Sequence, residues 1–231
     1  MSALANQRSA GPATTPAHAL DRLRAAIGSS ELRPGQRVGQ EEVAAAIGVS
    51  VAPVREALRT LEQEGQVTYV PRRGYFVTEL AIEDLEQIYE LRQLLEARAA
   101  RRALPKLGEG DLTRIRIAAT ECAEAAQASD IVAQLGATRR LHFAVFEPAD
   151  QPHLIRLIQL LWDSTEAYRA LYYNSPGERL ESIRAHDRMI VALMQRDSAR
   201  LIAVMDEHRE RALRTLRTVL LPDGQGAPTG P

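Results

Sequence analysis

Apolar residues recur at intervals of three and four positions along most of the chain after Ala81. In the first of these stretches, the residues that share one helical face are Leu85, Ile88, Leu95 and Ala99. The same period continues and predicts further helices over residues 109–129, 131–147, 151–173, 177–196 and 198–220. No strand pattern interrupts them, and the connections are short. This part of the chain therefore predicts an antiparallel helical bundle.

A different pattern occupies residues 40–58, where small and apolar side chains fall at the spacing of two short helices joined by a tight turn. Val43 and Ile47 lie four positions apart on the first helix, and Gly48 permits the left-handed conformation that the turn needs. Ser50 is placed to cap the second helix by accepting a backbone N–H. The pattern predicts a helix-turn-helix that reads DNA, with an ordinary helical hairpin as the alternative.

A short hairpin is predicted after the second helix, because residues 67–70 and 75–78 are β-prone runs separated by a turn. Such a hairpin forms a wing, and arginines at its tip suit phosphates or a narrow minor groove. A further helix is predicted over residues 17–29, upstream of the motif. The candidate DNA-binding residues are Val51, Ala52, Arg55 and Arg59 on the second helix and Arg72, Arg73 and Gly74 in the wing.

The segments RPGQRV, AAAIGVS, PVREALRTLEQEG and RRGYFV closely resemble the GntR family of bacterial transcription regulators. The resemblance covers residues 17–78 and implies a winged helix-turn-helix domain there. Residues 79–221 look like the all-helical ligand-sensing and dimerisation domain, called FCD, of the family's FadR-like branch. The chain departs from the family where an arginine and a small hydroxyl residue are common, since Val51 and Ala52 occupy these positions. Either side chain could touch a thymine methyl in the major groove.

Composition adds limits on the partners and the compartment. Acidic and basic residues nearly cancel, 30 against 29, so attraction to DNA must come from a local patch. The single Cys122 excludes an internal disulfide framework, and no apolar run approaches the roughly 18 residues of a membrane span. We therefore expect a cytoplasmic protein without membrane contact. Residues 1–16 and 222–231 are expected to be disordered tails.

Three histidines, His142, His186 and His208, lie on the apolar faces of three different predicted helices. Neutral imidazoles that converge in one bundle could hold a divalent cation of the zinc or nickel type, and three separately hydrogen-bonded core histidines are the alternative. The resemblance favours the metal, because metal-binding FCD domains carry histidines at these three positions. They also carry an aspartate where this chain has Thr138, and its loss implies a weaker site or a place for water or an effector oxygen.

Arg92 falls on the apolar face of the first bundle helix, where a guanidinium group needs an anion. The anion could be an inward glutamate, or the side chain could extend to the surface. The resemblance implies a small carboxylate or another acidic metabolite as effector, which Arg92 could bind in bidentate fashion while the metal holds a second oxygen. The other candidate effector-binding residues are Arg139, Tyr172 and Ser182.

These observations together predict a mainly α protein that acts as a ligand-responsive transcription regulator and not as an enzyme. We expect a homodimer that binds a palindromic operator in double-stranded DNA, with repression relieved by the effector as the default. A metal-dependent hydrolase using the three histidines is one alternative, but the chain has no HExxH helix, nucleophile elbow or phosphate-binding glycine loop. A helical adaptor that binds another protein is the second alternative.

Overall fold

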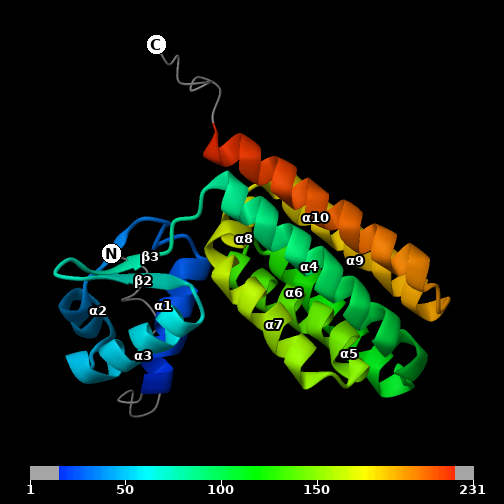
Figure 1. The fold of residues 1–231 in the computed structure, drawn as a ribbon, viewed down its shortest axis with the longest axis horizontal. Coiled ribbons are helices and arrows are strands. Elements are labelled where there is room, and N and C mark those ends of the chain that lie inside the picture. Colours follow the sequence, from blue (N-terminus) through cyan, green and yellow to red (C-terminus); the bar gives the residue numbers. More distant parts are fainter. Residues whose placement is uncertain (1–15, 222–231) are drawn as a thin grey trace. The chain divides into compact units, whose positions relative to one another are not determined.

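The computed structural model describes residues 16–221, which are mainly α-helical, as the sequence predicts (Figure 1). The described residues divide into two compact units. The first comprises the chain up to Glu79 together with Arg156–Ala170, and the second comprises Leu80–Ile155 and the chain from Leu171 onward.

The first unit contains the predicted helix-turn-helix and wing. Its elements are α1 (Pro16–Gly28), β1 (Arg37–Val38), α2 (Gln40–Ile47), α3 (Val51–Gln63), β2 (Val67–Val70) and β3 (Gly74–Val77). The strands form one antiparallel sheet in the order β1-β3-β2, with Val38 opposite Tyr75. The sequence does not predict β1, because two residues are too few to show the alternation that identifies a strand.

The turn between α2 and α3 has the left-handed conformation that the sequence predicts. Gly48 has φ +73°, and its backbone N–H donates to the carbonyl of Ala44. Ser50 lies at the N-cap position of α3, but its side chain makes no capping hydrogen bond, so that prediction was wrong. The reason lies in the helix itself: Pro53 occupies the third helical position, where it has no N–H to offer to a capping oxygen.

The single helix predicted over residues 151–173 is in fact two helices, α7 (Pro152–Ser164) and α8 (Glu166–Tyr173). They are separated at Thr165, whose hydroxyl donates to the carbonyl of Leu161 at 3.0 Å. The guanidinium of Arg169 donates to the carbonyl of Trp162 at 2.6 Å. These side chains satisfy carbonyls at the end of α7. Thr165 stands at the N-cap position of α8, which is a signal that the sequence prediction of one continuous helix did not use.

The second unit is the antiparallel helical bundle. Its elements are α4 (Ile82–Ala103), η1 (Leu104–Lys106), α5 (Glu109–Gln127), α6 (Ile131–Phe146), η2 (Glu147–Ala149), α9 (Pro176–Met194) and α10 (Ser198–Leu220), with the parts of α7 and α8 that lie outside the first unit. Helix α5 packs on α6 and α9, α9 packs on α10, and α4 contacts both α6 and α10 (Figure 1). The bundle interior is therefore lined by several helices that are far apart in the sequence.

The tails expected at residues 1–16 and 222–231 lie outside the described residues, apart from Pro16, which begins α1. Among the described helices, none combines the length and the apolar character that a membrane crossing would require.

Candidate functional site

Helix α3 presents an exposed face that carries the candidate DNA-reading residues. Its opposite face is buried through Val54, Ala57, Leu58 and Leu61. Ala52, Arg55 and Arg59 are exposed, and Val51 is half-buried. The Nε of Arg55 donates to the side-chain oxygen of Gln40 at 3.4 Å. Because this bond is long and exposed, a base edge can replace it at little cost.

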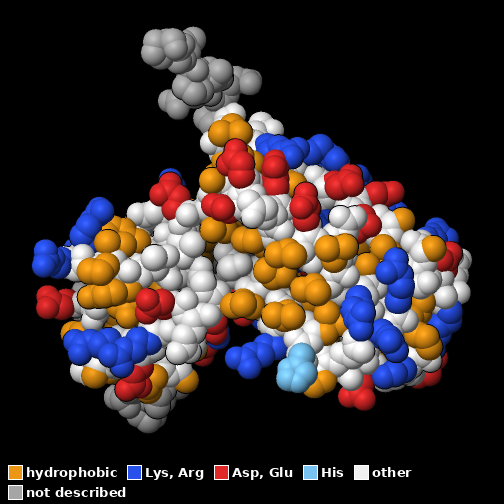
Figure 2. Space-filling model, in the orientation of Figure 1, with side chains coloured by type: hydrophobic (Ala, Val, Ile, Leu, Met, Phe, Trp, Pro, Cys, Tyr) orange, Lys and Arg blue, Asp and Glu red, His pale blue; other side chains and the backbone are white. Residues whose placement is uncertain are grey.

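The tip of the wing holds two exposed arginines, Arg72 and Arg73. Arg72 has φ +63°, and the backbone N–H of Arg73 closes the turn onto the carbonyl of Val70 at 3.0 Å. Arg37, on β1, donates from Nε to the carbonyl of Arg73 at 3.2 Å. Arg37 was not among the predicted DNA-binding residues, because only the pairing of β1 with β3 brings it beside the wing. Figure 2 shows basic side chains over the β2–β3 turn and over the helix-turn-helix region.

The three predicted histidines meet inside the bundle. His142 comes from α6, His186 from α9 and His208 from α10, and one ring nitrogen of each lies within 4.8 Å of the others. His142 and His186 are buried and His208 is half-buried. Nitrogens held about 2.1 Å from one tetrahedral ion lie about 3.4 Å apart, so the rings would have to approach one another by up to about 1.4 Å to hold a metal.

The histidine cluster is kept neutral by its surroundings. Burial lowers the pKa of His186 to about 3 and that of His208 to about 4, with positive charge on neighbouring groups as a further cause. Burial also places the pKa of His142 well below its ordinary value. Among the described residues, the buried Nε2 of His186 has no hydrogen-bond partner. Neutral rings with an unused buried nitrogen fit a divalent metal ion.

The hydroxyl of Thr138 lies within hydrogen-bonding distance of Cys122 and Tyr173, beside the histidine cluster. Its Oγ1 lies 3.4 Å from Sγ of Cys122 and 3.3 Å from the hydroxyl of Tyr173. The Tyr173 hydroxyl lies 2.9 Å from Oγ of Ser182, and Sγ of Cys122 lies 3.6 Å from Nδ1 of His186. Burial raises the pKa of the Cys122 thiol. Cys122 and Tyr173 were not among the predicted site residues, because only helix packing brings them close to the histidines.

Arg92 is buried and paired with a carboxylate of its own helix. Its Nε donates to Glu96 at 2.9 Å, and the other oxygen of Glu96 accepts from Arg209 at 2.7 Å. Arg209 also donates to Asp206 at 2.6 Å. Burial alone would raise the pKa of Glu96, but the two guanidinium groups hold it well below its usual range. The inward-glutamate interpretation of Arg92 therefore describes this structure.

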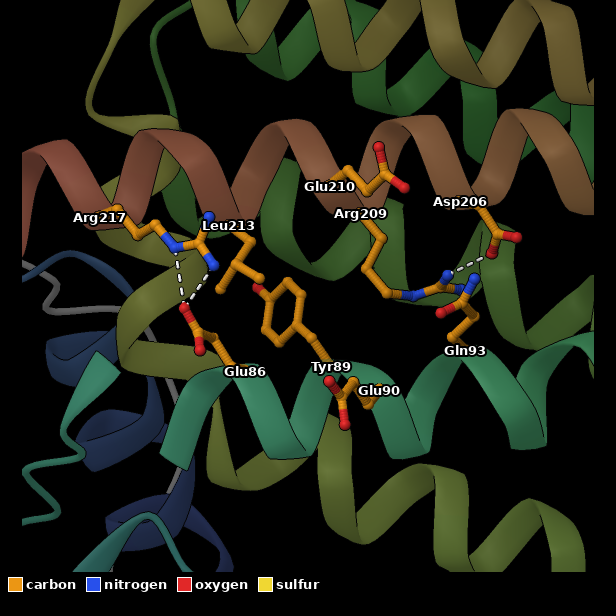
Figure 3. Close-up of a pocket in the computed structure, with 9 residues that line it drawn as sticks. All are labelled: Glu86, Tyr89, Glu90, Gln93, Asp206, Arg209, Glu210, Leu213 and Arg217. Atoms are coloured by element: carbon orange, nitrogen blue, oxygen red, sulfur yellow. Dashed lines mark hydrogen bonds and ion pairs between the residues drawn. The ribbon is translucent and has the colours of Figure 1, made fainter. Parts of the chain in front are cut away.

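A hollow of about 170 Å³ lies between α4 and α10, beside this ionic cluster (Figure 3). It is lined by Glu86, Tyr89, Glu90, Gln93, Asp206, Arg209, Glu210, Leu213 and Arg217. Arg209 thus belongs both to the buried cluster and to a hollow at the surface. Arg217 and Glu86 form an ion pair at one end of the hollow.

The remaining candidate effector residues are placed differently. Tyr172 donates from its hydroxyl to the carbonyl of Glu178 at 3.4 Å, and its ring centroid lies 6.3 Å from that of His208. Ser182 is buried within the hydrogen-bonded groups beside His186. Arg139 is half-buried, and its guanidinium lies 4.8 Å from the ring of Phe143. The structure brings Tyr172 and Ser182 to the histidine region, whereas Arg139 stacks on an aromatic ring.

Metal-free protein is expected to lose stability as the pH falls below about 6.5. The pKa of each clustered histidine is lower in the folded than in the unfolded state. Each ring therefore contributes to the free energy of unfolding fully above about pH 6.5, and this contribution is lost as the pH falls toward 3 to 4. For His186 the loss between pH 6.5 and about pH 5 is about 2 kcal/mol. Urea unfolding in a chelating buffer measures this slope. A His186→Gln variant should show a shallower slope, and an unfolding free energy that is constant over this range would contradict the prediction.

Comparisons with known proteins agree with this architecture. The model of the FCD domain matches residues 87–211, and the model of bacterial regulatory proteins of the gntR family matches residues 15–77. The chain is 26% identical over 170 residues to the uncharacterized HTH-type transcriptional regulator YdhC of Bacillus subtilis (strain 168), covering 73% of this chain and 76% of that protein.

Two further likenesses come from Escherichia coli. The HTH-type transcriptional repressor RspR of strain K12 is 25% identical over 206 residues, covering 85% of this chain and 86% of RspR. The solved structure of E. coli McbR/YncC superimposes with a TM-score of 0.77 at 23% identity, covering 89% of this chain and 98% of that one. The latter likeness concerns the fold.

Proposed function

Since this chain belongs to the GntR family of bacterial transcription regulators and carries an FCD domain, we propose that it is a dimeric repressor that releases a palindromic operator when an acidic metabolite binds. It is a transcription regulator and not an enzyme, so the hydrolase and adaptor alternatives are set aside. The observation that carries the proposal is the exposed face of α3, where Arg55 stands clear of the core beside a wing tipped with arginines.

The proposed DNA contacts divide by chemistry. Arg55 and Arg59 project from α3 into the major groove, where an arginine can bind the O6 and N7 acceptors of guanine. Val51 and Ala52 offer only apolar contact and fit thymine methyl groups. Arg72 and Arg73, with Gly74, bring the wing to the phosphates or the minor groove. A dimer would present two such surfaces to two half-sites, which explains why we expect a palindromic operator. We expect the protein to bind this operator in the bacterial cytoplasm.

The proposed sensor lies in the bundle. His142, His186 and His208 would hold a divalent metal, which would supply a Lewis-acidic centre for an oxygen of the effector. Thr138 adds no negative charge, so an acidic ligand is the natural source of an anion there. Arg92 would bind a second carboxylate of the ligand, with Tyr172 and Ser182 as hydroxyl partners and Arg139 as a more distant cation.

Release of DNA requires that the effector bind two arrangements of the dimer with different affinity. A coupling of about 1 to 3 kcal/mol is typical of such regulators and would lower operator affinity by roughly 5- to 150-fold. The repressor assignment is supported by the similarity to RspR, which is named a transcriptional repressor.

Gel-shift titration with the DNA that flanks the protein's own gene tests the DNA part of the proposal. We expect one specific palindrome to be bound with a stoichiometry of two chains, against competing random DNA. Binding without sequence preference, or by a single chain, would contradict it.

A thermal-shift screen of small organic acids, with zinc, with nickel and without added metal, tests the sensor. We expect a metal-dependent rise in melting temperature for a subset of the acids, and the same acids should weaken the gel shift. Arg92→Ala should retain operator affinity and lose the response to the acid. A variant that still responds fully would remove Arg92 from the ligand site.

A further inference from the structure

Five buried side chains form a continuous line of contacts behind His186. They come from α5, α6, α8 and α9, and the order is His186, Cys122, Thr138, Tyr173 and Ser182. The successive separations are 3.6, 3.4, 3.3 and 2.9 Å. Each inner member is a thiol or hydroxyl, which can donate one hydrogen bond and accept another.

The two ring nitrogens of His186 face different groups. Nδ1 faces the sulfur of Cys122, whereas the buried Nε2 has no hydrogen-bond partner among the described residues and belongs to a ring that meets His142 and His208. A neutral imidazole carries its proton on only one nitrogen, and the hydrogen bond of that nitrogen decides which one it is. The Cys122 sulfur can accept a hydrogen bond from Nδ1–H, and in that tautomer Nε2 keeps its lone pair.

We propose that Cys122 is a positioning residue for the histidine metal site, because its sulfur accepts the Nδ1–H of His186 and leaves Nε2 to the metal. In this arrangement the Cys122 thiol donates a hydrogen bond to Thr138, the Thr138 hydroxyl donates to Tyr173, and the Tyr173 hydroxyl donates to Ser182. This inference rests on the proposed function, in which the three histidines hold a divalent ion. Cys122 itself is not a ligand, since its sulfur lies on the far side of the His186 ring from Nε2.

The line of contacts also gives Thr138 a definite role. Its oxygen accepts a hydrogen bond from Cys122 and its hydroxyl donates one to Tyr173, so Thr138 connects the support of His186 to the hydroxyls of Tyr173 and Ser182. The first partner of a metal-bound histidine typically changes metal affinity by 10- to 100-fold when it is removed. Replacing Cys122 should therefore change metal affinity even though Cys122 would not itself be a ligand.

The tautomer of His186 can be observed directly in metal-free protein by long-range ¹H–¹⁵N correlation spectroscopy of the imidazoles. We expect the Nδ1–H form in the natural protein and in Cys122→Ser, whose oxygen can also accept. We expect Cys122→Ala to lose this preference. A natural protein with its His186 proton on Nε2 would overturn the inference, whether or not the site binds metal.

Metal affinity gives the second readout, with zinc and nickel ions competed against a chromophoric chelator. Cys122→Ala should bind about 10- to 100-fold more weakly, and Cys122→Ser should stay close to the natural protein. Ile115→Val, another small reduction of a buried α5 side chain, is the matched control and should bind as the natural protein does. Melting temperatures of all four proteins identify any loss that comes from unfolding.

The outcomes distinguish a failure of the proposed metal site from a failure of the proposed role of Cys122. If the natural protein binds neither ion, the metal site itself is wrong and the role of Cys122 falls with it. If the natural protein binds metal and Cys122→Ala binds it equally well with an unchanged tautomer, only the role of Cys122 is wrong.

Discussion

Replacing Arg55 by alanine is expected to reduce operator binding at least about thirtyfold. A guanidinium that binds one guanine contributes about 1 to 3 kcal/mol, and a dimer loses two such contacts, or about 2 to 6 kcal/mol. Arg55 is exposed and bonded only weakly to Gln40, so the fold should be unaffected. Fluorescence anisotropy with the operator measures the loss, and unfolding should show unchanged stability.

Arg72→Ala is the matched control for this experiment. Its guanidinium lies at the wing tip and is proposed to contact phosphate, so its loss should weaken specific and random DNA to a similar extent and lower the dependence on salt. Arg55→Ala should instead reduce the preference for the operator over random DNA. If Arg55→Ala binds the operator normally, α3 is not the recognition helix.

Replacing Glu96 by glutamine is expected to cost about 3 to 5 kcal/mol of unfolding free energy. The carboxylate is 1% exposed and lies between the guanidinium groups of Arg92 and Arg209. A neutral side chain of the same shape removes the carboxylate that both buried guanidinium groups contact, and Asp206, which accepts from Arg209, is in contact with one of the two. Chemical denaturation of the natural protein and the variant measures the difference.

Glu178→Gln provides the comparison, because it removes a carboxylate from a partly exposed pair with Arg211. Such a pair contributes only about 0 to 1 kcal/mol. A triple variant, Arg92→Met with Glu96→Leu and Arg209→Met, should recover most of the stability lost in Glu96→Gln, since it removes the buried charges together. If Glu96→Gln costs no more than Glu178→Gln, the buried cluster does not stabilise the bundle.

The local chemistry of the chain predicts the winged helix-turn-helix well. Gly48 permits the left-handed turn, and the spacing of Val54 and Leu58 indicates which face of α3 is buried. Local patterns fail where a side chain acts on a distant carbonyl or strand. At the break near Thr165, Arg169 from α8 satisfies the carbonyl of Trp162, and the two residues of β1 are recognisable as a strand only through their pairing with β3.

The candidate site also combines features that the local sequence predicts with features that depend on contacts between distant residues. Three histidines on apolar helix faces could be predicted to converge, and the structure brings them within 4.8 Å. The pairing of Arg92 with Glu96 is readable as a spacing of four on one helix, whereas Arg209 joins them from 113 residues away. Cys122 carries no local signal at all, since only the packing of α5 on α9 brings its sulfur to His186.

Glu96 also limits which acidic ligands could bind Arg92, because such a ligand must displace the Glu96 carboxylate from the guanidinium group. This resident carboxylate is tethered beside the guanidinium, so it competes at an effective concentration of the order of millimolar or more, as groups joined by a short tether do. A simple monoacid gains nothing by exchanging with it. If the histidines hold an ion as proposed, a ligand that also bound this ion would have a second source of affinity, so competition from Glu96 would favour acids with two binding groups over simple monoacids.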